Sequence, residues 1–184
     1  MPSPKPRRSR RTGAGKEGAP KPPSSPVQLA IRYLGPRRRF EREVRLHLRK
    51  REVSAPEIES AIDRLKELDL VSDAETTRAW IRDRMNFAPR GRLLLRRELL
   101  SKGVAADVVD EALDEIVGAD DEAQAAVDFL RRGARKWSGL EEAVARRRMW
   151  SALARRGFPA SACRAALIQF AEETGIDAGD EAWG

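Results

Sequence analysis

The chain has 184 residues and a net charge of +7, with 35% charged residues, one cysteine and one histidine. A single cysteine excludes a disulfide framework and a cysteine-built metal site, and a single histidine excludes a His-rich metal site and most nucleophilic schemes. No apolar run approaches the roughly 18 residues that a membrane span needs, and the N-terminus lacks the apolar stretch of a secretory signal. These features favour a soluble, cytoplasmic protein with no catalytic centre, no metal, no cofactor and no membrane association.

Residues 1–26 have the composition of a disordered basic tail. They hold seven bases, one acid, seven prolines and three glycines. Such a segment buries too little apolar surface to offset the entropy of ordering. Two interpretations stay open: non-specific attraction to phosphate backbones, or a solubilising leader with no specific role.

A repeat begins after the tail. The segments 47–62, 98–113 and 152–167 align without a gap. Matched apolar positions include the sets Leu48/Leu99/Leu153, Val53/Val104/Phe158 and Ile62/Leu113/Leu167. A period of about fifty residues indicates stacked supersecondary units, none of which buries its apolar face alone.

Apolar spacing predicts three helices in each unit. The predicted helices, in chain order, are 27–35, 38–51 and 54–68 in a first repeat (27–70), 72–86, 91–102 and 105–117 in a second (71–118), and 119–136, 139–156 and 159–173 in a third (119–174). Residues 175–184 are expected to form a loose acidic end. The predicted fold is all-α: three tandem three-helix repeats in an elongated, curved, solenoid-like array.

Helix boundaries carry their own signals. The capping-box pattern of a hydroxyl followed three residues later by Glu occurs at Ser54/Glu57, Ser72/Glu75 and Ser138/Glu141. Gly103 and Gly157 stand at matched positions where a helix would end in a left-handed residue. The first repeat has Glu52 there, so its turn is expected to differ or to be strained.

Several single residues are assigned to packing. Trp80 and Trp150 are expected in the core, whereas Trp137 and Trp183 are left unassigned between packing and stacking. The only histidine is expected at the core boundary, and Cys163 as a small buried apolar group. In the second repeat, Val104, Val108, Ala112 and Ile116 are expected to share a helix face.

Arginines gather on the middle helix of each unit. Arg38, Arg42, Arg45 and Arg49 recur at helical spacing and form one stripe. As a set, these basic faces predict an extended surface for nucleic acid or for an acidic protein groove; singly, each arginine also fits a solvated helix face with acid–base pairs. The candidate partner-binding or DNA-binding residues are Arg37, Arg38, Arg39, Arg42, Arg45, Arg49, Arg90, Arg92, Arg96, Arg97, Arg146, Arg147, Arg148 and Arg155.

Three stretches resemble the RecX family of bacterial recombination regulators. Residues 30–53 (AIRYLGPRRRFEREVRLHLRKREV) are similar to the first block of that family, with a Glu-apolar pair at Glu43 and Val44. Residues 62–84 resemble the link between its repeats, and residues 88–104 (APRGRLLLRRELLSKGV) resemble its second repeat. The resemblance covers residues 27–173. The third unit is the most divergent.

This resemblance implies a modulator of the RecA recombinase that is not an enzyme. Such proteins bind the RecA filament on single-stranded DNA, mainly as inhibitors, and limit filament growth, ATP hydrolysis and strand exchange. The expected protein is a monomer that contacts single-stranded DNA directly or through RecA. The alternative is an independent nucleic-acid-binding helical repeat protein, although the helices that follow each turn carry few bases.

Overall fold

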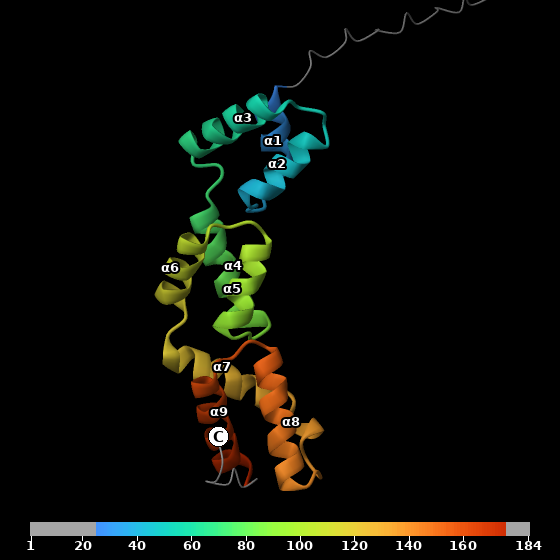
Figure 1. The fold of residues 1–184 in the computed structure, drawn as a ribbon, viewed down its shortest axis with the longest axis vertical. Helices are drawn as coiled ribbons and strands as arrows, with labels where there is room; N and C mark the ends of the chain where they lie inside the picture. The colour runs from blue at the N-terminus through green and yellow to red at the C-terminus, as the bar shows by residue number, and fades with distance from the viewer. Residues whose placement is uncertain (1–24, 176–184) are drawn as a thin grey trace, which may run out of the picture.

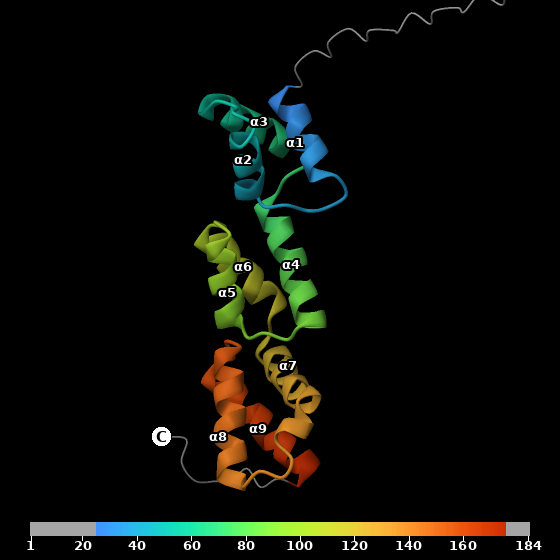
Figure 2. The same ribbon diagram turned by 90° about the vertical axis from the view of Figure 1, so that its right-hand side faces the viewer.

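The computed structural model describes residues 25–175, which form three helical bundles stacked end to end in an elongated array (Figures 1 and 2). Within these residues every regular element is helical. The elements are α1 (Pro26–Leu34), α2 (Glu41–Arg49) and α3 (Ala55–Glu67) in the first bundle, α4 (Asp73–Phe87), α5 (Arg92–Ser101) and α6 (Ala106–Ile116) in the second, and α7 (Ala119–Arg132), the 3-10 helix η1 (Ala134–Lys136), α8 (Glu142–Arg155) and α9 (Ala160–Thr174) in the third. The all-α repeat architecture is therefore confirmed.

Each bundle has a core of its own. The three leucines matched in the sequence repeat, Leu48, Leu99 and Leu153, are all fully buried, each in a different core. Side chains buried to this extent stabilise the fold by about 1.5–3 kcal/mol each relative to an exposed position. Stability is thus spread over three modest cores rather than one large one.

The middle helices α2, α5 and α8 end in the same turn. The amide of Val53 donates to the carbonyl of Leu48 at 3.3 Å, and the two other repeats place the same bond between their matched residues. This turn needs a left-handed residue, which is Gly103 (φ 87°) and Gly157 (φ 79°) in the later repeats and Glu52 (φ 61°) in the first. Of the two expectations for the first turn, a different geometry or strain, the structure shows the strain. Its geometry is conserved with a non-glycine residue, at a cost of about 1–2 kcal/mol.

The middle helices also form a head-to-tail column, with α8 below α5 and α5 below α2 (Figure 2). The amide of Gly91 donates to the carbonyl of Arg156 at 3.0 Å, and the amide of Leu93 donates to the carbonyl of Gly157 at 3.1 Å. Free amides at the start of α5 thereby satisfy free carbonyls at the end of α8, and the two helix dipoles align. A Cβ on Gly91 would lie 2.1 Å from the Gly157 carbonyl oxygen, so the close approach needs glycine.

The junction between the first two bundles uses side chains instead. Phe40, which precedes α2, is buried in the core of the second bundle. The Arg42 guanidinium donates to the carbonyl of Ser101 at 2.8 Å, near the end of α5. Lys102 lies over the Phe40 ring, 5.4 Å from its centroid. Cations therefore stabilise the negative end of α5, as expected for a residue in the last turn of a helix.

An acid from the following bundle caps each of the first two middle helices. Asp73 of α4 accepts the amide of Glu41 at 2.8 Å, and Glu122 of α7 accepts the amide of Arg92 at 2.6 Å. Burial raises the pKa of both carboxyls above the usual value, although the amide bonds act in the opposite direction. The third middle helix is capped locally, because Glu141 accepts two amides of its own first turn.

Several boundaries differ from the sequence prediction. The helix expected over 119–136 breaks after Arg132, and a 3-10 turn follows. The capping box at Ser138 and Glu141 is wrong: Glu141 caps the helix alone, and the Ser138 hydroxyl donates to the carbonyl of Arg135. The face expected in the second repeat is confirmed, because Val104 and Ala112 are buried in the second core and Val108 and Ile116 pack against it. Val109 and Leu113 widen this face. The predictions for residues 1–24 and 176–184, Trp183 included, lie outside the described residues.

Candidate partner-binding surface

The arginine stripe of α2 is largely occupied by bonds within the molecule. Arg45 lies between Glu59 and Glu41, with nitrogen–oxygen distances of 3.0 Å to both, and the hydrogen bond to Glu59 is the main cause of the raised pKa of Arg45. Arg38 approaches Glu75 of the second bundle at 3.6 Å. Arg42 bonds across the junction, as described above. Among the described residues, only the last arginine of the stripe, at position 49, makes no side-chain hydrogen bond or ion pair.

Two more arginines lie in the basic turn before α2, and one of them is bound while the other is open. The Arg39 guanidinium lies 4.0 Å from the centroid of the Tyr33 ring and donates to the Tyr33 carbonyl at 3.0 Å. Tyr33 in turn stacks on His47 at 3.9 Å between ring centroids. Desolvation and neighbouring cations lower the pKa of His47, and its partial burial matches the expected boundary position. Arg37 is exposed.

The arginines of the second bundle are mostly paired with acids of that bundle. The pairs are Arg90 with Glu98, Arg92 with Asp114, and Arg96 with Asp110. The Arg96–Asp110 hydrogen bond is the main reason why the pKa of that aspartate is lowered. Arg97 is exposed, and no ion pair involves it among residues 25–175.

The third bundle carries the most accessible positive charge. Arg147, Arg148 and Arg155 are exposed on α8 and make no side-chain hydrogen bond or ion pair with another described residue. With Ser151 and Trp137 they line a shallow depression. Arg146 is half-buried on the same helix. Three candidate arginines of α8 are thus open, whereas most of the candidates on α2 and α5 are engaged internally.

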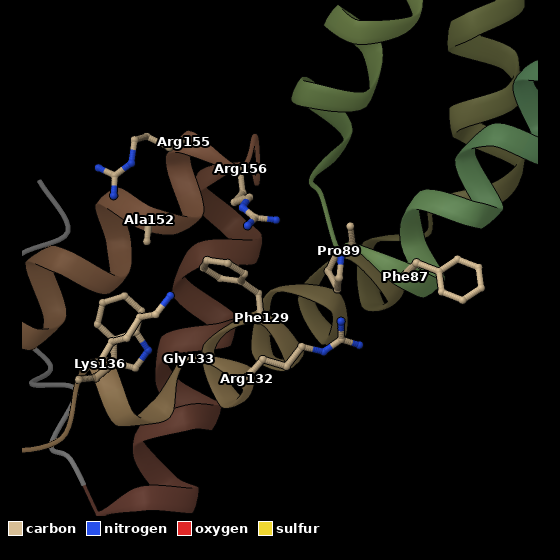
Figure 3. Close-up of a pocket in the computed structure, with 11 residues that line it drawn as sticks. Phe87, Pro89, Phe129, Arg132, Gly133, Lys136, Ala152, Arg155 and Arg156 are labelled. Carbon is tan, nitrogen blue, oxygen red and sulfur yellow. The ribbon is translucent and has the colours of Figure 1, made fainter.

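A larger hollow lies where the second and third bundles meet (Figure 3). Its volume is about 560 Å³. We call it the basic hollow, because its lining among residues 25–175 includes no acid and four cations: Arg132, Lys136, Arg155 and Arg156. Its aromatic lining includes Phe87, 80% exposed at the rim, Phe129 and Trp137. The Arg156 guanidinium lies 4.7 Å from the centroid of the Phe129 ring. The other three cations of the hollow have no partner among the described residues.

Two of the four cations that line this hollow were not identified from the sequence. Arg132 and Lys136 were not candidates, because the expected helix over 119–136 gave no reason to place them at a bundle junction. Arg132 ends α7, and Lys136 lies in the 3-10 turn that follows the break; both line the hollow. Trp137, left unassigned, is buried in the third core and donates its indole N–H to the carbonyl of Leu130 at 3.3 Å. The run Arg131-Arg132-x-x-Arg135-Lys136 was the available sequence signal.

The part of the chain that the structure describes does not support a metal site, a membrane span or a nucleophilic cysteine. Residues 25–175 contain no cluster of His, Cys, Asp or Glu suited to a metal ion. No helix in this range is long and apolar enough to cross a membrane. The buried Cys163 has a pKa raised to about 11, chiefly by desolvation, so its thiol is a poor nucleophile. Trp80 and Trp150 are half-buried against the cores of their bundles, as expected.

Comparison with family models gives three adjacent matches. Residues 27–65 match the model described as RecX, first three-helix domain, residues 72–113 match the second three-helix domain, and residues 120–167 match the third. Each match falls on one of the three bundles. The divergent third unit is thus recognised along with the other two.

Curated relatives and solved structures agree with this assignment. The chain is 32% identical over 167 residues to a regulatory protein RecX of Streptomyces coelicolor, covering 87% of this chain and 88% of the relative. It is 30% identical to a regulatory protein RecX of Thermobifida fusca, covering 91% and 94%. The crystal structure of RecX from Lactobacillus salivarius superposes with a TM-score of 0.75 at 21% identity, over 80% of this chain and 95% of that one. At that identity the superposition shows the fold alone.

Proposed function

Because the chain belongs to the RecX family of regulatory proteins, we propose that it regulates RecA by binding the RecA filament on single-stranded DNA. It acts mainly as an inhibitor, limiting filament growth, ATP hydrolysis and strand exchange. The observation that carries this proposal is the match of all three bundles, in order, to the three domains of one regulatory family. The protein acts as a cytoplasmic monomer without catalysis of its own.

The shape of the molecule supports a filament partner. Three small bundles in a line present a long surface relative to their mass, which suits an extended repeating partner better than a compact ligand. The head-to-tail column of α8, α5 and α2 runs the length of this array and carries the candidate arginines. Its internal ion pairs stiffen the column and leave selected cations open for the partner.

We assign the main contact to the third bundle and to three outlying arginines. Among the candidate arginines, Arg147, Arg148 and Arg155 are the open ones of α8, and Arg37, Arg49 and Arg97 are those of the first two bundles. Open cations lose only water on binding, whereas a paired arginine must first give up its carboxylate. The paired candidates on α2 and α5 therefore contribute stiffness more than affinity.

The alternative function, independent nucleic-acid binding, is the weaker of the two. In helix-turn-helix DNA readers the second helix enters the major groove. Here α6 would take that place, but it holds five acids and no base. Four of these acids pair with Arg92, Arg96 or Arg78, which fixes them at the surface. Such a helix repels a phosphate backbone.

Co-sedimentation with RecA filaments tests the proposal. RecA assembled on a long oligo(dT) with a non-hydrolysable ATP analogue should carry the protein into the pellet. The triple variant Arg147→Glu, Arg148→Glu, Arg155→Glu should bind at least ten-fold more weakly. The charge-matched variant Arg37→Glu, Arg49→Glu, Arg97→Glu should lose less. Binding to the oligonucleotide alone, equal to binding to the filament, would instead support the alternative function.

A further inference from the structure

We propose that the acidic segment 176–184 of this same chain docks in the basic hollow and occupies it when no other polyanion is bound. The segment holds three acids, Asp177, Asp180 and Glu181, no base, and the indole of Trp183. From the described residues the hollow offers four cations, no acid and an aromatic lining. The hollow shares Arg155 with the proposed filament contact, but docking within one chain is tested without RecA.

Charge complementarity selects this occupant over the rest of the chain. The other segment outside the described residues, 1–24, holds seven bases and one acid, so the hollow repels it. Three cations of the hollow lack a partner among the described residues, and the segment supplies three carboxylates. Its Ile176 and Trp183 match the apolar part of the lining formed by Phe87, Phe129 and Ala152.

The end of α9 is bonded to the end of α7, whose next residues line the hollow. Glu173, in the last turn of α9, accepts a hydrogen bond at 2.8 Å from Arg131 at the end of α7. The two residues after Arg131, Arg132 and Gly133, both line the hollow. The last turn of α9 is thus tied to the segment that forms one wall of the hollow. Nine residues span up to about 30 Å when extended, which is ample for this path.

The end of α9 also turns the chain off the helix axis. Gly175 closes the helix in a left-handed conformation (φ 69°), and its amide bonds to the carbonyl of Ala171 at 2.9 Å. A left-handed residue at this point ends the helix and redirects the chain. Because only a short connection joins the segment to the hollow, the effective concentration of the segment is in the millimolar range.

Docking of the segment gives the hollow a built-in competitor. An anionic partner that binds there must displace three carboxylates that are present at high effective concentration. Such a competitor lowers apparent affinity for every weak polyanion and leaves the hollow open to one that binds more strongly. Neutralising the segment should therefore raise affinity for a polyanion probe several-fold at low salt.

Carbodiimide cross-linking of the full chain tests the docking directly, because this reagent joins only carboxylates and amines in contact. Lys136 is the one lysine among the residues that line the hollow. After tryptic digestion, mass spectrometry should show Lys136 joined to Asp177, Asp180 or Glu181. The pair Lys66–Glu41, 2.9 Å apart, is the positive control for the reaction, and the exposed Lys50 is the negative control.

The expected yield of these links is at least ten-fold above that of links from Lys50 to the same acids. Lys136→Arg should abolish them, and Arg132→Glu with Arg155→Glu should reduce them strongly. Equal yields from Lys136 and Lys50 would overturn the proposal. Links that appear only between differently isotope-labelled chains would overturn it in favour of a second copy as occupant. Absence of the links, together with loss of oligo(dT) binding in the Arg132→Glu, Arg155→Glu variant, would identify nucleic acid as the occupant instead.

Discussion

At the scale of single residues, two glycines set how the second and third bundles meet. Gly157 adopts a left-handed φ of 79°, and a Cβ added there would lie 2.3 Å from the amide nitrogen of Leu94. The obstacle is backbone, which cannot move aside without breaking the column. Sequence alone predicted the left-handed turn but not the contact, because the partner helix is more than sixty residues away.

Gly157→Ala should therefore lower the free energy of unfolding by about 3 kcal/mol, the sum of a left-handed alanine and an overpacked junction. Gly139→Ala is the matched control, because Gly139 has the same φ of 79° and nothing within 4 Å of an added Cβ. Its cost should be about 1 kcal/mol, from the backbone alone. Urea unfolding of both variants measures the difference. Equal losses would mean that the junction tolerates a side chain.

The buried carboxyl of Glu122 makes stability depend on pH. Burial raises its pKa in the folded state, so the folded chain holds this proton more tightly than the unfolded chain. Its contribution to stability is then greatest below the unfolded pKa, about 4.3, and declines as the pH rises through the folded pKa. Glu122→Gln removes this titration and keeps an oxygen that can accept the Arg92 amide.

The stability of Glu122→Gln relative to the wild type should therefore increase between pH 4 and pH 7. Urea unfolding at both pH values measures it, with the exposed Glu142→Gln as control for the loss of one carboxylate. A relative stability that falls over the same range would show that the amide bond outweighs burial.

At the scale of elements, α2 shows why a stripe of like charges is an ambiguous signal. The sequence places its three arginines on one line with Arg38, which precedes the helix, but does not say what faces them. Glu59 and Glu75 come from α3 and α4, and the Ser101 carbonyl comes from the end of α5. Only the packing of separate helices brings these groups together. The repeat register, by contrast, depends on local apolar spacing, and the sequence predicted it.

Arg42→Ala should lower the free energy of unfolding by about 1 kcal/mol, because it removes an exposed charge-assisted bond across the first junction. Arg49→Ala, on the same stripe, should stay within about 0.5 kcal/mol of the wild type. Thermal or urea unfolding compares the two. A larger loss for Arg49→Ala would reverse our division of the stripe into structural and open positions.

The repeat register itself is tested on α5. Leu99→Ala should lower the free energy of unfolding by about 2–5 kcal/mol, because the side chain is fully buried in the second core. Leu93→Ala on the same helix is the control, since this residue is 58% exposed. Its effect should be small. Similar effects at the two positions would contradict the assigned core face.

At the scale of the whole molecule, the sequence was sufficient for the number of bundles and their order, and it was insufficient for the basic hollow. Bundle identity follows from matched apolar positions within about fifty residues. The hollow gathers Phe87, Arg132 and Arg155 from three helices of two bundles. Its existence depends on a helix break after Arg132, which Gly133 marks in the sequence although the predicted helix ran through it. The sequence pattern predicts local structure, but it does not predict which distant residues come to lie together.

The most direct test of the central claim is ATP hydrolysis by the cognate RecA on single-stranded DNA while this protein is titrated in. The account predicts inhibition at concentrations well below those at which the protein saturates the DNA alone, and weaker inhibition by the Arg147→Glu, Arg148→Glu, Arg155→Glu variant. Hydrolysis that stays unchanged up to equimolar protein and RecA, alongside tight and salt-sensitive binding to the DNA itself, would contradict the claim.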